Sequence, residues 1–201
     1  NIFVWGTSAG SLVGIHLSYC DDDDRPESTY GSGSDPDLGC ADCEGNDYDH
    51  SRKPNALVSC WGAIGDLAWI DSEDDIVPTI MFHGTADPII PINSGVPLLD
   101  IFLPIVYGSN LIHDRLDELG IHNELYAEHG ELHEYWGTVN GNWFSGPNDY
   151  FYQIQADAYD FLYEYITIES DDVEGDLNQD DIVNVVDVIL LVNYILSEEY
   201  V

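Results

Sequence analysis

The sequence predicts an α/β fold, in which a parallel sheet carries helices on its faces, followed by a small all-α module. Short apolar runs typical of buried strands alternate with longer segments of helical period, which is the pattern of a parallel sheet. No apolar run approaches the ~18 residues of a membrane span. The predicted strands are 2–5, 55–60, 78–82 and 123–127, and the predicted helices are 9–19, 109–119 and 149–166.

The chain is strongly acidic. It holds 4 Lys and Arg residues against 39 Asp and Glu residues, which gives a formal net charge of −35 at pH 7. Such a surface repels nucleic acids and anionic membranes, so we expect neither as a partner. Most of these carboxylates are expected to form a solvated shell, and their density is compatible with binding of divalent cations.

The first ten residues predict a catalytic serine. The apolar strand runs into Gly6-Thr7-Ser8-Ala9-Gly10, and a helix follows at once. A serine at so sharp a strand-to-helix turn adopts strained backbone angles and stands clear at the carboxyl edge of the sheet. The residues two before and two after it must be small, so that the helix can pack. Ser8 is therefore predicted to be a nucleophile, and the alternative is a merely structural glycine-rich turn.

This G-T-S-A-G turn resembles the nucleophile elbow of the α/β-hydrolase superfamily, in particular of its carboxylesterase and lipase-like members. The resemblance covers residues 1–168 and implies the C-terminal half of that family's parallel sheet with its flanking helices. Since the chain opens on Asn1 in mid-strand, we expect a fragment whose first strands are missing. The family takes one oxyanion donor from the residue after the nucleophile, here Ala9. The second comes from an upstream loop that this sequence does not contain.

A serine becomes a good nucleophile only when a histidine takes its proton and a carboxylate orients that histidine. Residues 83–91, His-Gly-Thr-Ala-Asp-Pro-Ile-Ile-Pro, resemble the family's H-G-x-x-D-x-x-V-P segment, which implies Asp87 as the acid. Asp66 is the rival acid. The later segment resembles the family's G-H-[EG], which implies His133 as the base, with His129 as the rival.

Four cysteines and a long loop accompany these motifs. Residues 21–53 lack periodicity and form a loop that either rims the substrate cleft or is a solvated excursion. We expect two disulfides that tie this loop to the scaffold, and hence an oxidising, extracytoplasmic compartment. Free thiols and a zinc site are the alternatives. The cysteines are Cys20, Cys40, Cys43 and Cys60.

Two further groups of side chains are expected to support the site. His83 is expected to support the loop that carries the acid. Several tryptophans near the same loops are candidates for an aromatic platform that binds a sugar or a phenolic ester, with core packing as the alternative for each. They are Trp61, Trp69, Trp136 and Trp143.

After an acidic linker at 169–175, residues 176–201 predict a calcium-binding module. Oxygen-bearing side chains stand at positions 1, 3, 5, 9 and 12 of a loop, a backbone carbonyl stands at position 7, and a helix follows. This loop resembles one half of a dockerin type I repeat, an EF-hand-like unit, with Asp181 in place of the glycine at position 6. An acidic cap on an amphipathic helix is the alternative. The predicted ligands are Asp176, Asn178, Asp180, Ile182, Asn184 and Asp187.

Together these features predict a secreted or cell-surface-attached serine carboxylesterase, in which calcium is structural and no cofactor takes part in catalysis. The dockerin-like tail implies docking to a cohesin-like scaffold protein and suggests acetyl or feruloyl esters of polysaccharides as substrates. Two other functions stay open. One is a serine peptidase of the prolyl-oligopeptidase type, which has the same elbow and the same order of catalytic residues. The other is a non-catalytic fragment that binds partners in a calcium-dependent manner.

Overall fold

The structure is a computed structural model of the 201-residue chain. Its chain divides into two compact units, Asn1–Tyr165 and Ile166–Val201, each of which is described by itself. Among the described residues, no helix is both long enough and apolar enough to cross a bilayer. The residues that the structure describes are 1–40, 51–71, 76–140, 142, 144–166, 175, 177–178 and 183–197.

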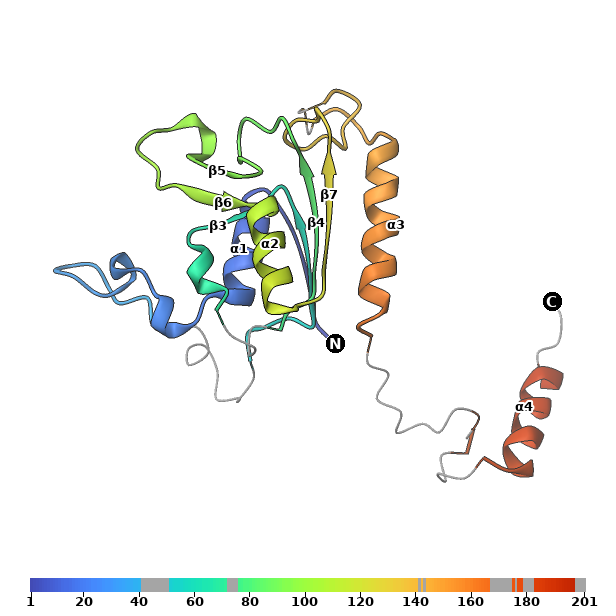
Figure 1. Ribbon diagram of the computed structural model, residues 1–201. Helices are drawn as coiled ribbons and strands as arrows, with labels where there is room; N and C mark the ends of the chain where they lie inside the picture. Colours follow the sequence, from blue (N-terminus) through green and yellow to red (C-terminus); the bar gives the residue numbers. More distant parts are fainter. Residues whose placement is uncertain are drawn as a thin grey trace. The chain divides into compact units, whose positions relative to one another are not determined.

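The first unit is built on a four-stranded parallel sheet (Figure 1). Its strands lie in the order β1-β2-β4-β7, and each neighbouring pair is parallel. The four strands predicted from the sequence are confirmed, although the first and third run on to Thr7 and Gly84. The bounds are β1 Phe3–Thr7, β2 Ala56–Cys60, β4 Thr79–Gly84 and β7 Asn123–Glu128.

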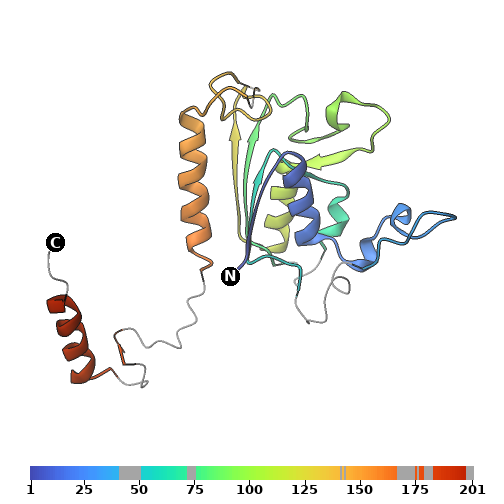
Figure 2. The same cartoon turned by 180° about the vertical axis from the view of Figure 1, so that it is seen from behind.

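Helices cover both faces of this sheet (Figures 1 and 2). Successive side chains of a strand point to opposite faces, so Leu57 of β2 joins one buried cluster with Ile112, and Val58 joins the other with Phe161. This two-sided burial explains why the central strands are apolar throughout. The helices are α1 Ala9–Tyr19 and α2 Ser109–Leu119 on one face, and α3 Asp149–Tyr163 on the other.

A small antiparallel sheet was not predicted. Its strands have two or three residues each, too short for an alternating pattern to show in the sequence. They lie in the order β3-β6-β5 and fix the long segment between β4 and α2, which carries Asp87. The bounds are β3 Ala63–Ile64, β5 Ser94–Gly95 and β6 Val106–Gly108. Short 3₁₀ turns at Asp22–Asp24, Glu27–Thr29, Leu67–Trp69 and Pro97–Leu99 complete the unit.

The prediction of two disulfides is wrong. Cys20 and Cys60 are thiols, whereas Cys40 is disulfide-bonded, and Cys43 lies outside the described residues. Cys60 ends the central strand beside Thr7, and Cys20 follows the far end of α1. The 11 residues of α1 separate these two thiols by roughly 16 Å, too far for a disulfide. The same separation rules out the four-cysteine zinc site.

The acidic loop leaves the sheet at the edge away from Ser8. Helix α1 starts at the carboxyl end of β1 and carries the chain back along the sheet before residues 21–40 begin (Figure 1). Two arginines organise the loop: Arg25 pairs with Asp37 at 2.6 Å, and Arg52 bonds Asp21 at 2.9 Å and the carbonyl oxygen of Cys20. Of the two readings of this loop, the described residues therefore favour the solvated excursion.

The second unit contains α4, Val185–Ser197. It confirms the helix that the sequence places after the predicted calcium loop. Of the predicted ligands, Asp176, Asp180 and Ile182 lie outside the described residues.

The two glycines around Ser8 are not equivalent. A Cβ added to Gly6 would overlap the carbonyl oxygen of Gly10, where the first turn of α1 crosses β1. A Cβ added to Gly10 would meet no atom within 4 Å. The requirement for a small residue therefore holds two positions before Ser8 and is wrong two positions after it.

We expect Gly6→Ala to lower the free energy of unfolding by about 1–3 kcal/mol, because backbone must move to admit the methyl group. Gly10→Ala is the matched control. It should leave stability unchanged or raise it by up to about 1 kcal/mol, because alanine favours the helix more than glycine does. Urea unfolding followed by circular dichroism measures both. Equal losses in the two variants would contradict this account of the elbow.

Candidate active site

Ser8 occupies the sharp turn between β1 and α1. Its φ of 51° and ψ of −119° place a non-glycine residue in a strained region of backbone space, as the sequence predicts. The backbone on both sides holds this turn in place: the Ser8 N–H donates to the Cys60 carbonyl at 3.0 Å, and the Ser8 carbonyl accepts from the Leu12 N–H at 3.0 Å. The Ser8 side chain is thereby fixed at the carboxyl edge of the sheet.

Asp87 lies in the loop that follows β4. One carboxylate oxygen, Oδ1, accepts the backbone N–H groups of Ile89 at 2.8 Å and Ile90 at 3.0 Å, in a turn that aspartate commonly forms. This leaves Oδ2 for histidines. His133 Nδ1 lies 2.7 Å from Oδ2, and His83 Nε2 lies 3.3 Å from it. The side chain of Asp87 is fully buried.

His83 supports the acid loop, as expected. Its ring is fully buried, with Nε2 3.0 Å from the Ile90 carbonyl and Nδ1 2.8 Å from the Ser109 hydroxyl. The carbonyl can only accept, so Nε2 carries the proton and Nδ1 accepts from Ser109. His83 therefore ties the end of β4 to the first residue of α2 and donates toward Asp87.

His133 joins Ser8 to Asp87. It comes from the loop after β7, and its Nε2 lies 2.8 Å from Ser8 Oγ. Because Asp87 accepts a hydrogen bond from the Nδ1–H group, the neutral ring presents an unprotonated Nε2 to the serine hydroxyl. The sequence-predicted set Ser8, Asp87 and His133 is thus connected by two short hydrogen bonds.

The rival residues lie elsewhere. Asp66 is exposed and caps the 3₁₀ turn Leu67–Trp69, where its Oδ1 accepts the Ala68 N–H at 2.9 Å. His129 is exposed in the turn at the end of β7. The loop brings His133 rather than His129 inward because it crosses closely over Gly84, where an added Cβ would overlap the Glu131 carbonyl oxygen.

The electrostatic balance keeps Asp87 ionised. Burial alone would raise the pKa of its carboxyl group, but the hydrogen bonds from His133 and His83 outweigh burial and lower it to about 2. At neutral pH the site therefore holds a carboxylate against one edge of the His133 ring and a hydroxyl against the other.

These residues open onto a pocket of about 450 Å³. One part of its wall is apolar, formed by Ile89, Leu98 and Phe144, and the other part is polar, formed by Glu134 and Asn142. Leu98 is 60% exposed and holds a positive φ of 59°. These wall residues were not predicted from the sequence. The G-H-[EG] resemblance is the signal that marks Glu134, whereas no motif marks the residues that come from the surrounding loops.

The predicted aromatic platform is wrong for two of its members. Trp61 is fully buried, with its ring 6.1 Å from that of His133 and 4.9 Å from that of Trp136. Trp69 packs against His16 and belongs to the cluster under α1 and α2. Trp143 lies outside the described residues.

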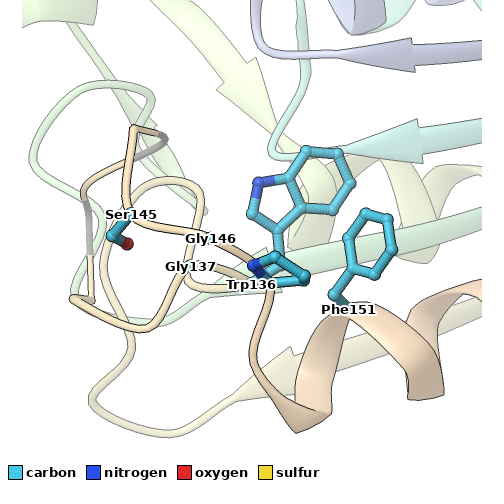
Figure 3. Close-up of a pocket in the computed structure, with 6 residues that line it drawn as sticks. Trp136, Gly137, Ser145, Gly146 and Phe151 are labelled. Carbon is cyan, nitrogen blue, oxygen red and sulfur yellow. The ribbon is translucent and has the colours of Figure 1, made fainter.

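Trp136 lines a second pocket of about 240 Å³ (Figure 3). Its indole ring and the ring of Phe151 stand 5.5 Å apart, edge to face, on the same side of this pocket, and Ser145 lies across from them. This pocket shares the loop that carries Asn142 and Phe144 with the pocket of Ser8.

The described part of the predicted calcium loop converges on Asp187. One oxygen, Oδ1, accepts the N–H groups of Leu177 at 2.8 Å and Asn178 at 3.2 Å, while Oδ2 accepts the Asn184 N–H at 2.7 Å. The backbone hydrogen bonds, that of Asn184 foremost, lower the pKa of this carboxyl group. Three predicted ligands, Asn178, Asn184 and Asp187, therefore belong to one curled loop, and oxygen donors of this kind fit calcium.

Comparisons with known proteins give solved structures only, since no family model and no curated protein matches the sequence. Esterase 2 of Thermogutta terrifontis, phosphoramylated by tabun, is 20% identical, with a TM-score of 0.46 over 81% of this chain and 54% of that one. Its propionate-bound form is 18% identical, with a TM-score of 0.46 over 81% and 55%. Esterase PE8 is 17% identical, with a TM-score of 0.43 over 82% and 50%.

The chain thus spans about half the length of the solved structures that it matches. TM-scores below 0.5 at such identities do not establish a shared activity, so function has to be inferred from the geometry of the site itself.

Proposed function

We propose that this chain is part of a serine carboxylic ester hydrolase, in which Ser8 is the nucleophile, His133 the general base and Asp87 the acid that orients it. The observation that carries the proposal is the unbroken chain of hydrogen bonds from Ser8 Oγ through His133 to Asp87, at 2.8 and 2.7 Å. A hydroxyl, an imidazole and a buried carboxylate in this order form the constellation that activates a serine for acyl transfer.

In the proposed reaction Ser8 Oγ attacks the ester carbonyl while His133 Nε2 takes its proton. The ionised Asp87 stabilises the imidazolium that forms. The N–H of Ala9, the first residue of α1, donates to the developing oxyanion, since the first N–H groups of a helix have no partner within it. His133 then gives its proton to the departing alcohol, and an acyl-enzyme remains. Water activated by His133 attacks this ester and releases the acid and Ser8.

The wider assignment is also a proposal. We place the enzyme outside the cytoplasm, free or attached to a cell surface, and propose acetyl or feruloyl esters of polysaccharides as substrates and a cohesin-like scaffold as partner. The disulfide at Cys40 supports an oxidising compartment. The chain's net charge of −35 supports a substrate that is neither a nucleic acid nor an anionic membrane.

Hydrolysis of p-nitrophenyl acetate and butyrate tests the catalytic assignment. We expect Ser8→Ala to lower kcat/KM at least about a thousandfold, because the remaining residues cannot form the acyl-enzyme. Ser32→Ala, in the exposed loop, is the matched control and should keep the full rate. A peptidase would instead favour prolyl p-nitroanilides. Equal rates in the Ser8 and Ser32 variants would contradict the assignment of Ser8 as the nucleophile.

We further propose that the loop around Asp187 binds calcium as a structural ion. A bound calcium ion would supply positive charge to a loop dense in carboxylates. Its ligands would be Asp176, Asn178, Asp180, Ile182, Asn184 and Asp187.

Titration of the full chain with calcium in about 0.15 M salt, which screens the acidic surface, measures this site. We expect one specific equivalent in the wild type and its loss in Asp187→Asn, which removes a ligand charge and keeps the shape of the side chain. Asp160→Asn, on exposed α3, should bind as the wild type does. Undiminished binding by the Asp187 variant would refute the site, and a chelator should leave ester hydrolysis unchanged.

A further inference from the structure

Glu134 is a buried carboxylate beside the catalytic histidine that the proposed mechanism does not use. It follows His133 directly, is only 6% exposed and lines the pocket that holds Ser8. Its φ of 55° is unusual for a residue with a side chain. Strained residues of this kind concentrate at binding and catalytic sites, where the surrounding structure holds them in place.

No Lys or Arg side chain among the described residues forms an ion pair with Glu134. All four Lys and Arg residues of the chain make ion pairs elsewhere: Arg25 with Asp37, Arg52 and Lys53 with Asp21, and Arg115 with Glu118. Among the described residues, no hydrogen bond or ion pair reaches the Glu134 carboxylate.

Burial raises the pKa of Glu134, the charge of Asp87 raises it further, and the neighbouring His133 lowers it. Asp87, which contacts Nδ1 of His133, accepts four close contacts from N–H groups and imidazole nitrogens. The difference leaves Glu134 with free acceptor capacity facing the pocket.

The polar residues of the pocket wall indicate which chemical group Glu134 can bind. Asn142 lines the same pocket as Glu134, and its Oδ1 already accepts the Phe144 N–H at 3.0 Å. The amide NH₂ of Asn142 remains a donor, so the polar part of the wall offers a carboxylate acceptor and an amide donor together. This combination matches a hydroxyl group, which donates to the one and accepts from the other. Three apolar residues, Ile89, Leu98 and Phe144, line the same pocket, and they suit an apolar acyl chain.

We propose that Glu134 is a specificity-determining residue, which makes the Ser8 pocket prefer esters that carry a hydroxyl group next to the scissile bond, as partial esters of polyols and sugars do. This inference rests on the proposed esterase function and names its substrate class. The carboxylate also disfavours anionic esters, because it repels a second negative charge in the pocket.

Three butyrates that share an acyl group test the proposal. Ethyl butyrate has no donor, glycerol 1-butyrate has two hydroxyl groups, and butyrylcholine has a cation without a donor. Titration of the released acid gives kcat/KM for each ester with the same product. We expect the wild type to favour glycerol 1-butyrate over ethyl butyrate. Glu134→Leu should lower that preference about tenfold or more, since a hydroxyl loses a charged acceptor. Glu134→Gln, which keeps an acceptor and loses the charge, should fall between the two.

The ratio of two substrates in one protein sample is the decisive readout, because a folding defect lowers both rates together. Asp160→Asn removes one negative charge from exposed α3 and should leave every ratio unchanged. An unchanged ratio of glycerol 1-butyrate to ethyl butyrate in both Glu134 variants would overturn the inference. So would a loss confined to butyrylcholine, since charge rather than hydroxyl recognition would then be at work. Both results leave the esterase function intact if Ser8→Ala is inactive, whereas a wild type without ester hydrolysis would overturn both.

Discussion

The hydrogen bond between His133 and Asp87 is the interaction on which the rest of the site depends, because it ties together loops from neighbouring strands. Asp87 follows β4 and His133 follows β7, while Ser8 follows β1 at the other side of the sheet. His133 must therefore reach across the carboxyl ends of β4 and β2 to meet the serine. Two features permit this reach. Gly84 has no side chain where the loop passes, and Trp61, just after β2, fills the space beneath the ring.

The two carboxylates beside His133 illustrate how hydrogen bonding separates groups of the same chemistry. Asp87 is buried yet strongly acidic, since backbone and imidazole donors surround it. Glu134 accepts no hydrogen bond from the described residues, and its pKa moves in the opposite direction. Asp87 thus orients the general base, whereas Glu134 can accept a hydrogen bond from a molecule in the pocket. The different hydrogen bonding of Asp87 and Glu134 therefore gives the two carboxylates different proposed roles.

The sequence predicted the parts of this protein that depend on local pattern and failed where distant contacts decide. Strands buried on both faces and helices of clear period were predicted correctly. Ser8, Asp87 and His133, each in a motif of fixed spacing, lie together as the sequence predicts. The strands β3, β5 and β6 were missed because strands of two or three residues are too short to show an alternating pattern. The expectation of two disulfides and the need for a small residue at Gly10 were wrong, because both depend on the course of α1 in space. Pocket residues such as Asn142 lie on loops without a recognisable motif, so the sequence does not predict their position.

The most direct test of the central claim, that His133 and Asp87 activate Ser8, is covalent labelling. The protein would be incubated with a fluorophosphonate, which reacts with activated serines, and the modified residue identified by peptide mass spectrometry. We expect one modified residue, Ser8, and labelling at least about a hundredfold slower in His133→Gln, which has no general base. Modification of another residue, or an unchanged rate in His133→Gln, would contradict the account.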